Sequence, residues 1–265
     1  MEMVNISAIK YFTALIHENA AKGKDSVSSQ MQYHNALRRL WGERIEFIMG
    51  SYAIYKSKQP LISSDDPDKK PKDCHKVQVW KIEEKQSDVN LALHLLKDAL
   101  KGDIDQVVLV TNDTDLVPAF LTLQELCPNI VRGLVVPTKK AHDDQKIERF
   151  ANVSLSGLAH WVRTHINEDE LRGSQLPDVV KSPSGGRSSK KPYSWYARPD
   201  NLTKMIELAL PVLKKEKSIM QWARKPNEWL DGKCPIDLIE TEEGSNLVFK
   251  YIQDYIEDKI DNGNM

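Results

Sequence analysis

Three aspartates stand where the sequence could carry out chemistry: Asp88 at the start of a helical stretch, and Asp113 and Asp115 in one turn. The turn follows directly after the apolar run 107–110. In an open α/β sheet, ligands bind at the carboxyl ends of the strands. Carboxylates gathered there suit Mg²⁺ or Mn²⁺, and a cation held in this way activates water. The pattern would allow Asp88, Asp113 and Asp115 to converge on one cation.

The same carboxylates also have a purely structural interpretation. Asp88 would favour the first turn of a helix electrostatically. Asp113 is of a type that is common in turns. Two aspartates separated by one residue in a turn are a weak signal by themselves, so their role depends on the surrounding sequence.

The elements around these aspartates predict an α/β fold. Apolar residues at spacings of three and four predict a helix over 88–100, with Ser87 as its N-cap and Gly102 at its end. The continuous apolar run 107–110 predicts a strand buried on both faces of a parallel sheet. Further strands are expected over 9–16, 45–55, 77–82 and 131–136, and further helices over 26–40, 116–126 and 154–166.

Composition excludes several classes of protein. The chain has 265 residues with 37 basic and 38 acidic side chains, a net charge of −1, which is unlike a bulk nucleic-acid packager. Its three cysteines, Cys74, Cys127 and Cys234, form no CxxC pair, which argues against a disulfide scaffold or a cysteine zinc site. No signal-peptide pattern or membrane-length apolar stretch is visible, so we expect a cytoplasmic protein with no membrane partner.

Composition also divides the chain into an α/β domain over 1–166, a linker over 167–200 rich in Pro, Ser and Gly, and a helical domain over 201–265. The linker region carries basic and aromatic side chains that could bind single-stranded RNA, or it could be a disordered, solvated segment. These side chains are Arg187, Lys190, Lys191 and Arg198, interleaved with Tyr193, Trp195 and Tyr196.

Two stretches carry a more specific pattern: EKQSDVNLA around Asp88 and TNDTDLVP from Thr111. With a further match within 9–37, they resemble the NYN family of PIN-like, metal-dependent nuclease domains, over roughly residues 1–180. The resemblance implies a PIN-like, Rossmannoid parallel sheet with flanking helices. It also implies hydrolysis of RNA by a metal-bound water, with the three aspartates as metal ligands. Lys85, Asn112 and Thr114 would then lie beside the RNA.

The first strand of that family, which ends in an aspartate and lies in the middle of the sheet, has no counterpart before Ile9. We therefore expect an N-terminally incomplete domain whose start is set too late, with weakened or lost nuclease activity. One alternative is a non-catalytic module that binds RNA or a protein. Another is a flavin-dependent pyridine-ring monooxygenase, as some relatives are labelled, although no GxGxxG follows a strand.

The stretch from Trp222 to Val248 resembles the C-terminal toxin-binding domain of Xre/MbcA/ParS-type antitoxins. The resemblance implies a protein partner or dimerisation through residues 201–265, with Trp222, Trp229 and Leu230 at the contact. Pro235 should begin a short helix, and Thr241 should cap the last one. Plain packing is the competing interpretation of the tryptophans. That interpretation gives a small core of Trp222, Trp229, Ile236, Leu238 and Ile239.

Overall fold

The computed structural model describes residues 5–62, 64–138, 150–183 and 185–261. The chain forms two compact units, Met1–Ser189 and Lys190–Met265. The boundary falls inside the stretch predicted as a linker. That stretch contains the short elements α5 (Glu168–Gly173), β7 (Val179–Val180) and β8 (Ser189–Lys190). The domain limits expected from composition stay a prediction.

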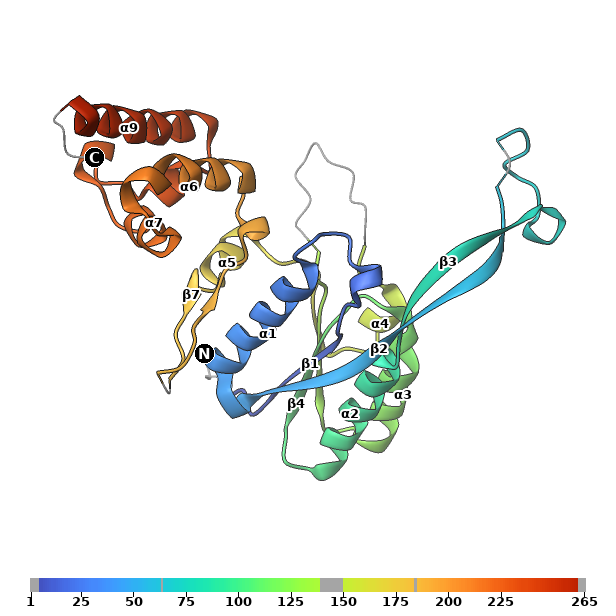
Figure 1. Ribbon diagram of the computed structural model, residues 1–265. Helices are drawn as coiled ribbons and strands as arrows, with labels where there is room; N and C mark the ends of the chain where they lie inside the picture. The colour runs from blue at the N-terminus through green and yellow to red at the C-terminus, as the bar shows by residue number, and fades with distance from the viewer. Residues whose placement is uncertain (1–4, 63, 139–149, 184, 262–265) are drawn as a thin grey trace. The chain divides into compact units, whose positions relative to one another are not determined.

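The first unit is mixed α/β and begins with a sheet of three strands (Figure 1). β1 (Ile9–Ala14) pairs in parallel with the first part of β2 (Ile45–Pro60). From Ser51 onward, β2 pairs instead with β3 (Lys76–Lys85), and this pairing is antiparallel. The expected strands are therefore present, but β2 and β3 continue as a two-stranded ribbon past the end of β1.

A second sheet in the same unit is entirely parallel. It consists of β4 (Gln106–Val110), β5 (Val131–Val135) and β6 (Trp161–Arg163) in that order. Among the described residues, β1 and β4 each keep one edge without a ladder partner. Parallel strands are thus confirmed, but the one continuous sheet that we expected is divided in two.

Helix α2 (Ser87–Lys101) contacts both sheets. Its His94 ring packs edge-on against Phe12 of β1, while Leu95 and Ala99 join the apolar core with Val107 of β4. Gly102 ends the helix in the left-handed conformation, as predicted. The N-cap residue is Gln86, one residue earlier than expected, because Ser87 is already helical and its hydroxyl binds the Glu84 carboxylate.

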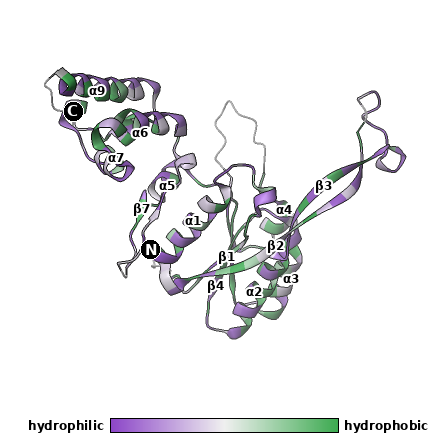
Figure 2. Ribbon diagram, in the orientation of Figure 1, coloured by the Kyte–Doolittle hydropathy of each residue, from purple (hydrophilic) through white to green (hydrophobic). Residues whose placement is uncertain are grey.

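Helices α1 (Ser26–Trp41), α3 (Val117–Leu126) and α4 (Val153–Ser156) also belong to this unit. The core between α2, α3 and the second sheet includes the fully buried side chains of Phe120, Leu123, Leu134 and Leu155. In Figure 2, hydrophobic and hydrophilic colours alternate along α2 and α3.

Two expectations about this unit are wrong. Val108 and Val110 of β4 are 45% and 61% exposed, so the strand is buried on one face only. Helices α2 and α3 cover the face that carries Val107 and Leu109. The expected helix over 154–166 is also wrong, because α4 ends at Ser156 and the chain returns as β6.

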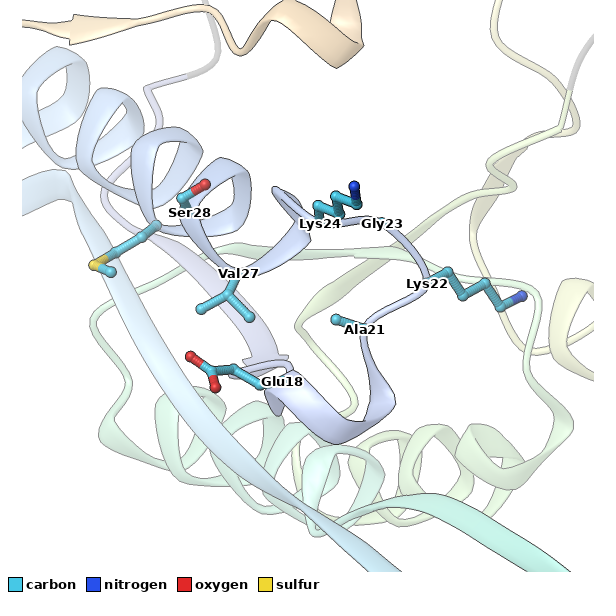
Figure 3. Close-up of a pocket in the computed structure, with 8 residues that line it drawn as sticks. Glu18, Ala21, Lys22, Gly23, Lys24, Val27 and Ser28 are labelled. Atoms are coloured by element: carbon cyan, nitrogen blue, oxygen red, sulfur yellow. The ribbon is translucent and has the colours of Figure 1, made fainter.

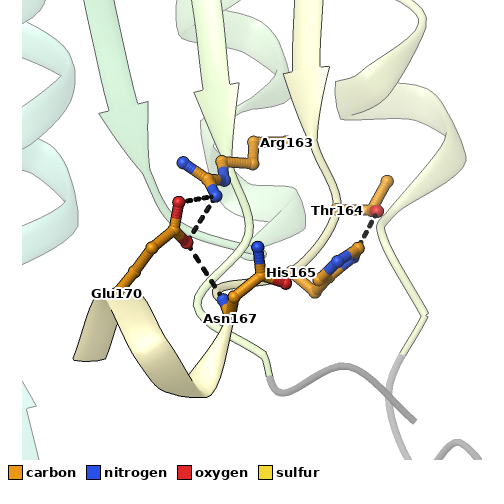
Figure 4. Close-up of polar contacts among 5 residues, drawn as sticks. All are labelled: Arg163, Thr164, His165, Asn167 and Glu170. Carbon is orange, nitrogen blue, oxygen red and sulfur yellow. Dashed lines mark hydrogen bonds and ion pairs between the residues drawn. The ribbon is translucent and has the colours of Figure 1, made fainter. Parts of the chain in front are cut away.

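The chain after β6 is held by the polar contacts in Figure 4. Arg163 at the end of β6 forms an ion pair with Glu170 of α5. The same Glu170 carboxylate accepts the Asn167 backbone N–H at 3.1 Å, which closes a capping box on α5. Thr164 and His165 bond to each other beside this pair, at 3.2 Å.

The second unit contains the helices α6 (Pro199–Leu213), α7 (Glu216–Ala223), α8 (Pro235–Leu238) and α9 (Glu242–Asp261). Pro235 begins α8, and the Thr241 hydroxyl accepts the Gly244 N–H at 3.1 Å, as both were predicted to do. The core includes Leu202, Met205, Ile219, Leu230, Ile239 and Val248.

Short 3₁₀ helices connect these elements. They are η1 (Glu18–Ala20), η2 (Gly42–Arg44), η3 (Pro71–Asp73), η4 (Thr114–Leu116), η5 (Tyr193–Trp195) and η6 (Glu228–Leu230). Among the described residues, no helix is long and apolar enough to cross a membrane.

Candidate functional site

The structure brings the three aspartates of the sequence analysis together at one place, which we call the acidic edge. Asp88 lies in the first turn of α2, Asp113 follows β4, and Asp115 lies in η4. A carboxylate oxygen from each lies within 4.8 Å of the others, and all three side chains are exposed. Asp88 and Asp113 are 25 positions apart in the chain. They lie close together because α2 packs against β4.

The surroundings of Asp88 change how readily its carboxyl gives up a proton. Partial burial raises the pKa of its carboxyl, and the neighbouring charges of Asp113, Asp115 and Glu84 raise it further. Like charges at short range disfavour a further negative charge. These surroundings therefore favour the protonated form of Asp88.

Asp113 and Thr111 also shape the turn itself. The Asp113 carboxylate accepts the Asp115 N–H at 3.0 Å, which caps η4. The Thr111 hydroxyl accepts the Asp113 N–H at 3.1 Å. The structural interpretation of Asp113 is thus correct, and it does not compete with a chemical role because one carboxylate has several acceptor positions.

Asn112 holds the acidic turn in place, in keeping with a residue that shapes the turn. Its amide donates to the Phe150 carbonyl at 2.9 Å and accepts the Asn152 N–H at 2.8 Å. Asn152 in turn caps α4 by accepting the Leu155 N–H at 3.0 Å. Asn112 therefore ties the acidic turn to α4, whereas Thr114 lies exposed at the start of η4.

Lys85 does not present a free charge at this edge. Its ammonium lies 2.5 Å from the Glu83 carboxylate, which also binds Lys81 and accepts the Tyr55 hydroxyl at 3.0 Å. Hydrogen bonds from these three partners lower the pKa of Glu83 to about 2. Lys85 is thus paired with Glu83, and its expected role in neutralising a phosphate stays a prediction.

The predicted contact residues of the helical unit separate into two kinds. Leu230 is 1% exposed and belongs to the core, and Trp222 is half-buried and stacked on Tyr251 at a centroid distance of 6.2 Å. Trp229 is 82% exposed, so its expected place in the core is wrong. Asn227 fixes the turn beneath it by accepting the Trp229 N–H at 2.9 Å. Trp229 is the most exposed of the three.

Two of the aromatic residues considered for RNA stacking make polar contacts within the second unit. Tyr196 is buried, with the Lys191 ammonium 4.2 Å from its ring centroid and Arg224 donating to its hydroxyl at 3.1 Å. Tyr193 donates its hydroxyl proton to Glu216. The stretch is therefore ordered, and the Tyr196 ring is buried rather than presented as a stacking platform.

Fold and site together define a class: a protein with an α/β unit that carries an acidic strand edge, followed by an antitoxin-like helical unit. Residues 208–254 match the family described as the Antitoxin Xre/MbcA/ParS C-terminal toxin-binding domain, which confirms that resemblance. Over 249 residues, the chain is 45% identical to 6-hydroxy-3-succinoylpyridine 3-monooxygenase HspA of Pseudomonas putida (strain DSM 28022 / S16), covering 94% of this chain and 77% of the relative. The chain belongs to the family of that protein. No solved structure matches it.

This relationship overturns the function expected from the aspartates. A metal-dependent ribonuclease with Mg²⁺ or Mn²⁺ and an RNA substrate is wrong, because the relative is named a monooxygenase; a non-catalytic RNA-binding module is no better supported. The physical reason is that exposed acidic groups are common without an ion. The resemblance to the NYN family and the PIN-like sheet stay predictions.

Monooxygenases as a class perform their oxygen chemistry with a redox cofactor, and flavin is the cofactor that the labels of some relatives imply. The turn after β4 contains no glycine and carries Asp113 and Asp115. It offers a flavin phosphate neither close backbone approach nor positive charge. The residues of the acidic edge do not fit a flavin nucleotide, and we assign no step to one there.

Proposed function

We propose that this chain is a monooxygenase that acts on 6-hydroxy-3-succinoylpyridine or a closely similar pyridine. The observation that carries the proposal is 45% identity to a protein of that name across 94% of the chain. Similarity of this extent includes both units, so it reaches the acidic edge as well as the helical domain.

Such a reaction transfers one atom of O₂ to the substrate and reduces the other to water, with two electrons and two protons from a donor such as reduced nicotinamide. In this proposal the acidic edge donates and accepts protons. Asp88, whose pKa is raised, exchanges a proton with the hydroxyl or ring nitrogen of a hydroxypyridine. Asp113 and Asp115 keep that pKa raised, and Asn112 holds their turn against α4.

The proposal is tested with purified full-length chain, 6-hydroxy-3-succinoylpyridine and reduced nicotinamide in air, with and without added flavin. Substrate and nicotinamide are followed together by chromatography and absorbance. We expect equal amounts of both to be consumed, and a slower reaction with 3-succinoylpyridine, which lacks the hydroxyl. Absence of substrate loss under every donor and flavin condition would contradict the proposal.

We also propose that the helical unit contacts a protein partner through Trp229. The antitoxin-like match over 208–254 and the 82% exposure of this indole support it. Tryptophan is a frequent anchor of protein interfaces. Light scattering of the full chain, alone and as the Trp229→Ala variant, tests self-association as one form of this contact. An unchanged mass would leave a different protein as the partner to seek.

A further inference from the structure

Two exposed features of the first unit lie outside the acidic edge. One is a hollow of about 560 Å³ beside the start of α1. Figure 3 shows its Lys22 and Lys24 side chains pointing away from each other, so they do not converge on one ligand. The other is the ribbon, which consists of Ser51–Pro60 of β2 and Lys76–Lys85 of β3. Figure 1 shows the ribbon running on beyond β1 and past the helices of this unit.

The ribbon exposes apolar side chains along its length. None of its side chains is buried, and Trp80 and Ile82 are 65% and 47% exposed. The Lys56 ammonium lies 5.2 Å from the centroid of the Trp80 ring, so both side chains are on one face of the ribbon. A two-stranded ribbon alone is marginally stable in water, and further strands or a packed surface normally support it. The exposed side chains therefore favour a partner that covers them.

The two edges of the ribbon differ in how well they could pair with another strand. This part of β2 carries Lys56, Lys58 and Pro60 and no acidic residue, and such residues keep an edge strand free. β3 carries both signs of charge, with Lys76 at its start and Glu84 near its end. On the side away from β2, it has no ladder partner among the described residues. The β3 edge is thus the one suited to an added strand.

The sequence of β3 selects a register for pairing with a second copy of itself. In an antiparallel pair, two opposite residues point their backbone groups either toward each other or away. In two identical strands they are therefore an even number of positions apart. A register centred on Lys81 places this lysine opposite its own copy, and like charges there are destabilising. A register centred on Trp80 instead places Lys76 opposite Glu84 of the partner subunit.

We propose that two copies of this chain associate through their β3 edges, in an antiparallel pair centred on Trp80. The pair has two-fold symmetry, so each contact away from the axis occurs twice. Trp80 lies opposite its own copy and diagonally across from Ile82 of the partner subunit, which covers both apolar groups.

The charges at the two ends of β3 also find partners in this pair. Within the described residues, Lys76 and Glu84 have no ion-pair partner. The Ser87 hydroxyl binds the Glu84 carboxylate, but a carboxylate has further acceptor positions. Association therefore adds two ion pairs of opposite charge, one at each end of the paired strands.

The experiment is analytical ultracentrifugation of the full chain over a series of concentrations up to about 100 µM. We expect the wild type to approach twice the chain mass of 30.2 kDa. Lys76→Glu places two carboxylates opposite each other at both ends, and should raise the Kd of the dimer about 10-fold or more. Trp80→Ala should also raise it, because the aromatic pair at the axis is lost. The double variant Lys76→Glu/Glu84→Lys restores opposite charges and should recover a Kd within about threefold of the wild type.

Lys58→Glu is the matched control, because it makes the same change of charge on the β2 edge, and it should leave the Kd unchanged. A wild type that stays at 30.2 kDa throughout would overturn the proposal and leave the ribbon to a different partner. Equal weakening by Lys58→Glu and Lys76→Glu would also overturn it, as would a double variant that is folded by circular dichroism but does not recover. Loss of the dimer in Trp229→Ala but not in Lys76→Glu would place the contact in the helical unit instead.

Discussion

Asp88 combines two features that a proton-transferring residue needs: an accessible carboxyl, and a pKa raised by partial burial and by the charges of Asp113 and Asp115. Under the proposed function, Asp88→Asn should lower kcat for oxygenation by about 100-fold or more, the usual range for a lost acid–base group. Steady-state kinetics measure the loss. Asp103→Asn, an exposed aspartate away from the cluster, should retain the wild-type rate, and an Asp88→Asn rate equal to that control would exclude the role.

Leu230 and Trp229 are neighbours with opposite surroundings. Leu230 is fully buried, so Leu230→Ala should lower the free energy of unfolding by about 2–5 kcal/mol, through lost burial and a cavity. Trp229 is exposed, so Trp229→Ala should change it by no more than about 0.5 kcal/mol. Urea denaturation of the two variants checks both values. Equal destabilisation would mean that Trp229 packs after all.

His34 is a buried histidine of α1 that faces the first sheet. It lies against the rings of Tyr11 and Phe47, with centroid distances of 5.7 and 4.9 Å. Burial lowers its pKa, and the charge of Arg38 lowers it further. The unfolded chain therefore binds a proton at His34 at higher pH than the folded protein does. Stability from this group is present above its ordinary pKa of about 6.5 and is lost as the pH falls below it.

We expect the urea midpoint to fall between pH 8 and pH 5.5, and part of that fall to disappear in His34→Gln, because the variant has no imidazole to protonate. His75→Gln, at an exposed histidine, should keep the full wild-type slope. An identical pH slope in His34→Gln and the wild type would show that the buried imidazole does not contribute.

Elements with a strong local pattern were predictable from the sequence. Helix α2 has a regular apolar stripe and a terminal Gly102, and it lies where it was expected. The division of the sheet and the replacement of a helix by β6 were not predictable, because they depend on pairing between distant segments. The meeting of Asp88 with Asp113 followed from their places at element ends. The reaction did not follow, because exposed carboxylates suit several chemistries.

At the scale of the whole molecule, each compact unit has a core of its own. Phe120→Ala removes a ring that is fully buried in the first unit, and Leu202→Ala removes a buried side chain of the second. Each change should cost about 2–5 kcal/mol and should lower the stability of its own unit only. Hydrogen exchange resolved by peptide measures this. Loss of protection throughout the chain in either variant would mean that the units unfold together.

The most direct test of the proposed function follows the oxygen atoms. The full chain is incubated under oxygen-18 gas with 6-hydroxy-3-succinoylpyridine and reduced nicotinamide. The molecular mass of the organic product is then measured by mass spectrometry. A monooxygenase predicts one oxygen-18 atom in the product, and none when oxygen-18 is supplied only as water. A product labelled from water alone would mean hydrolytic chemistry. No product in either arm would contradict the assignment of this chain as a monooxygenase.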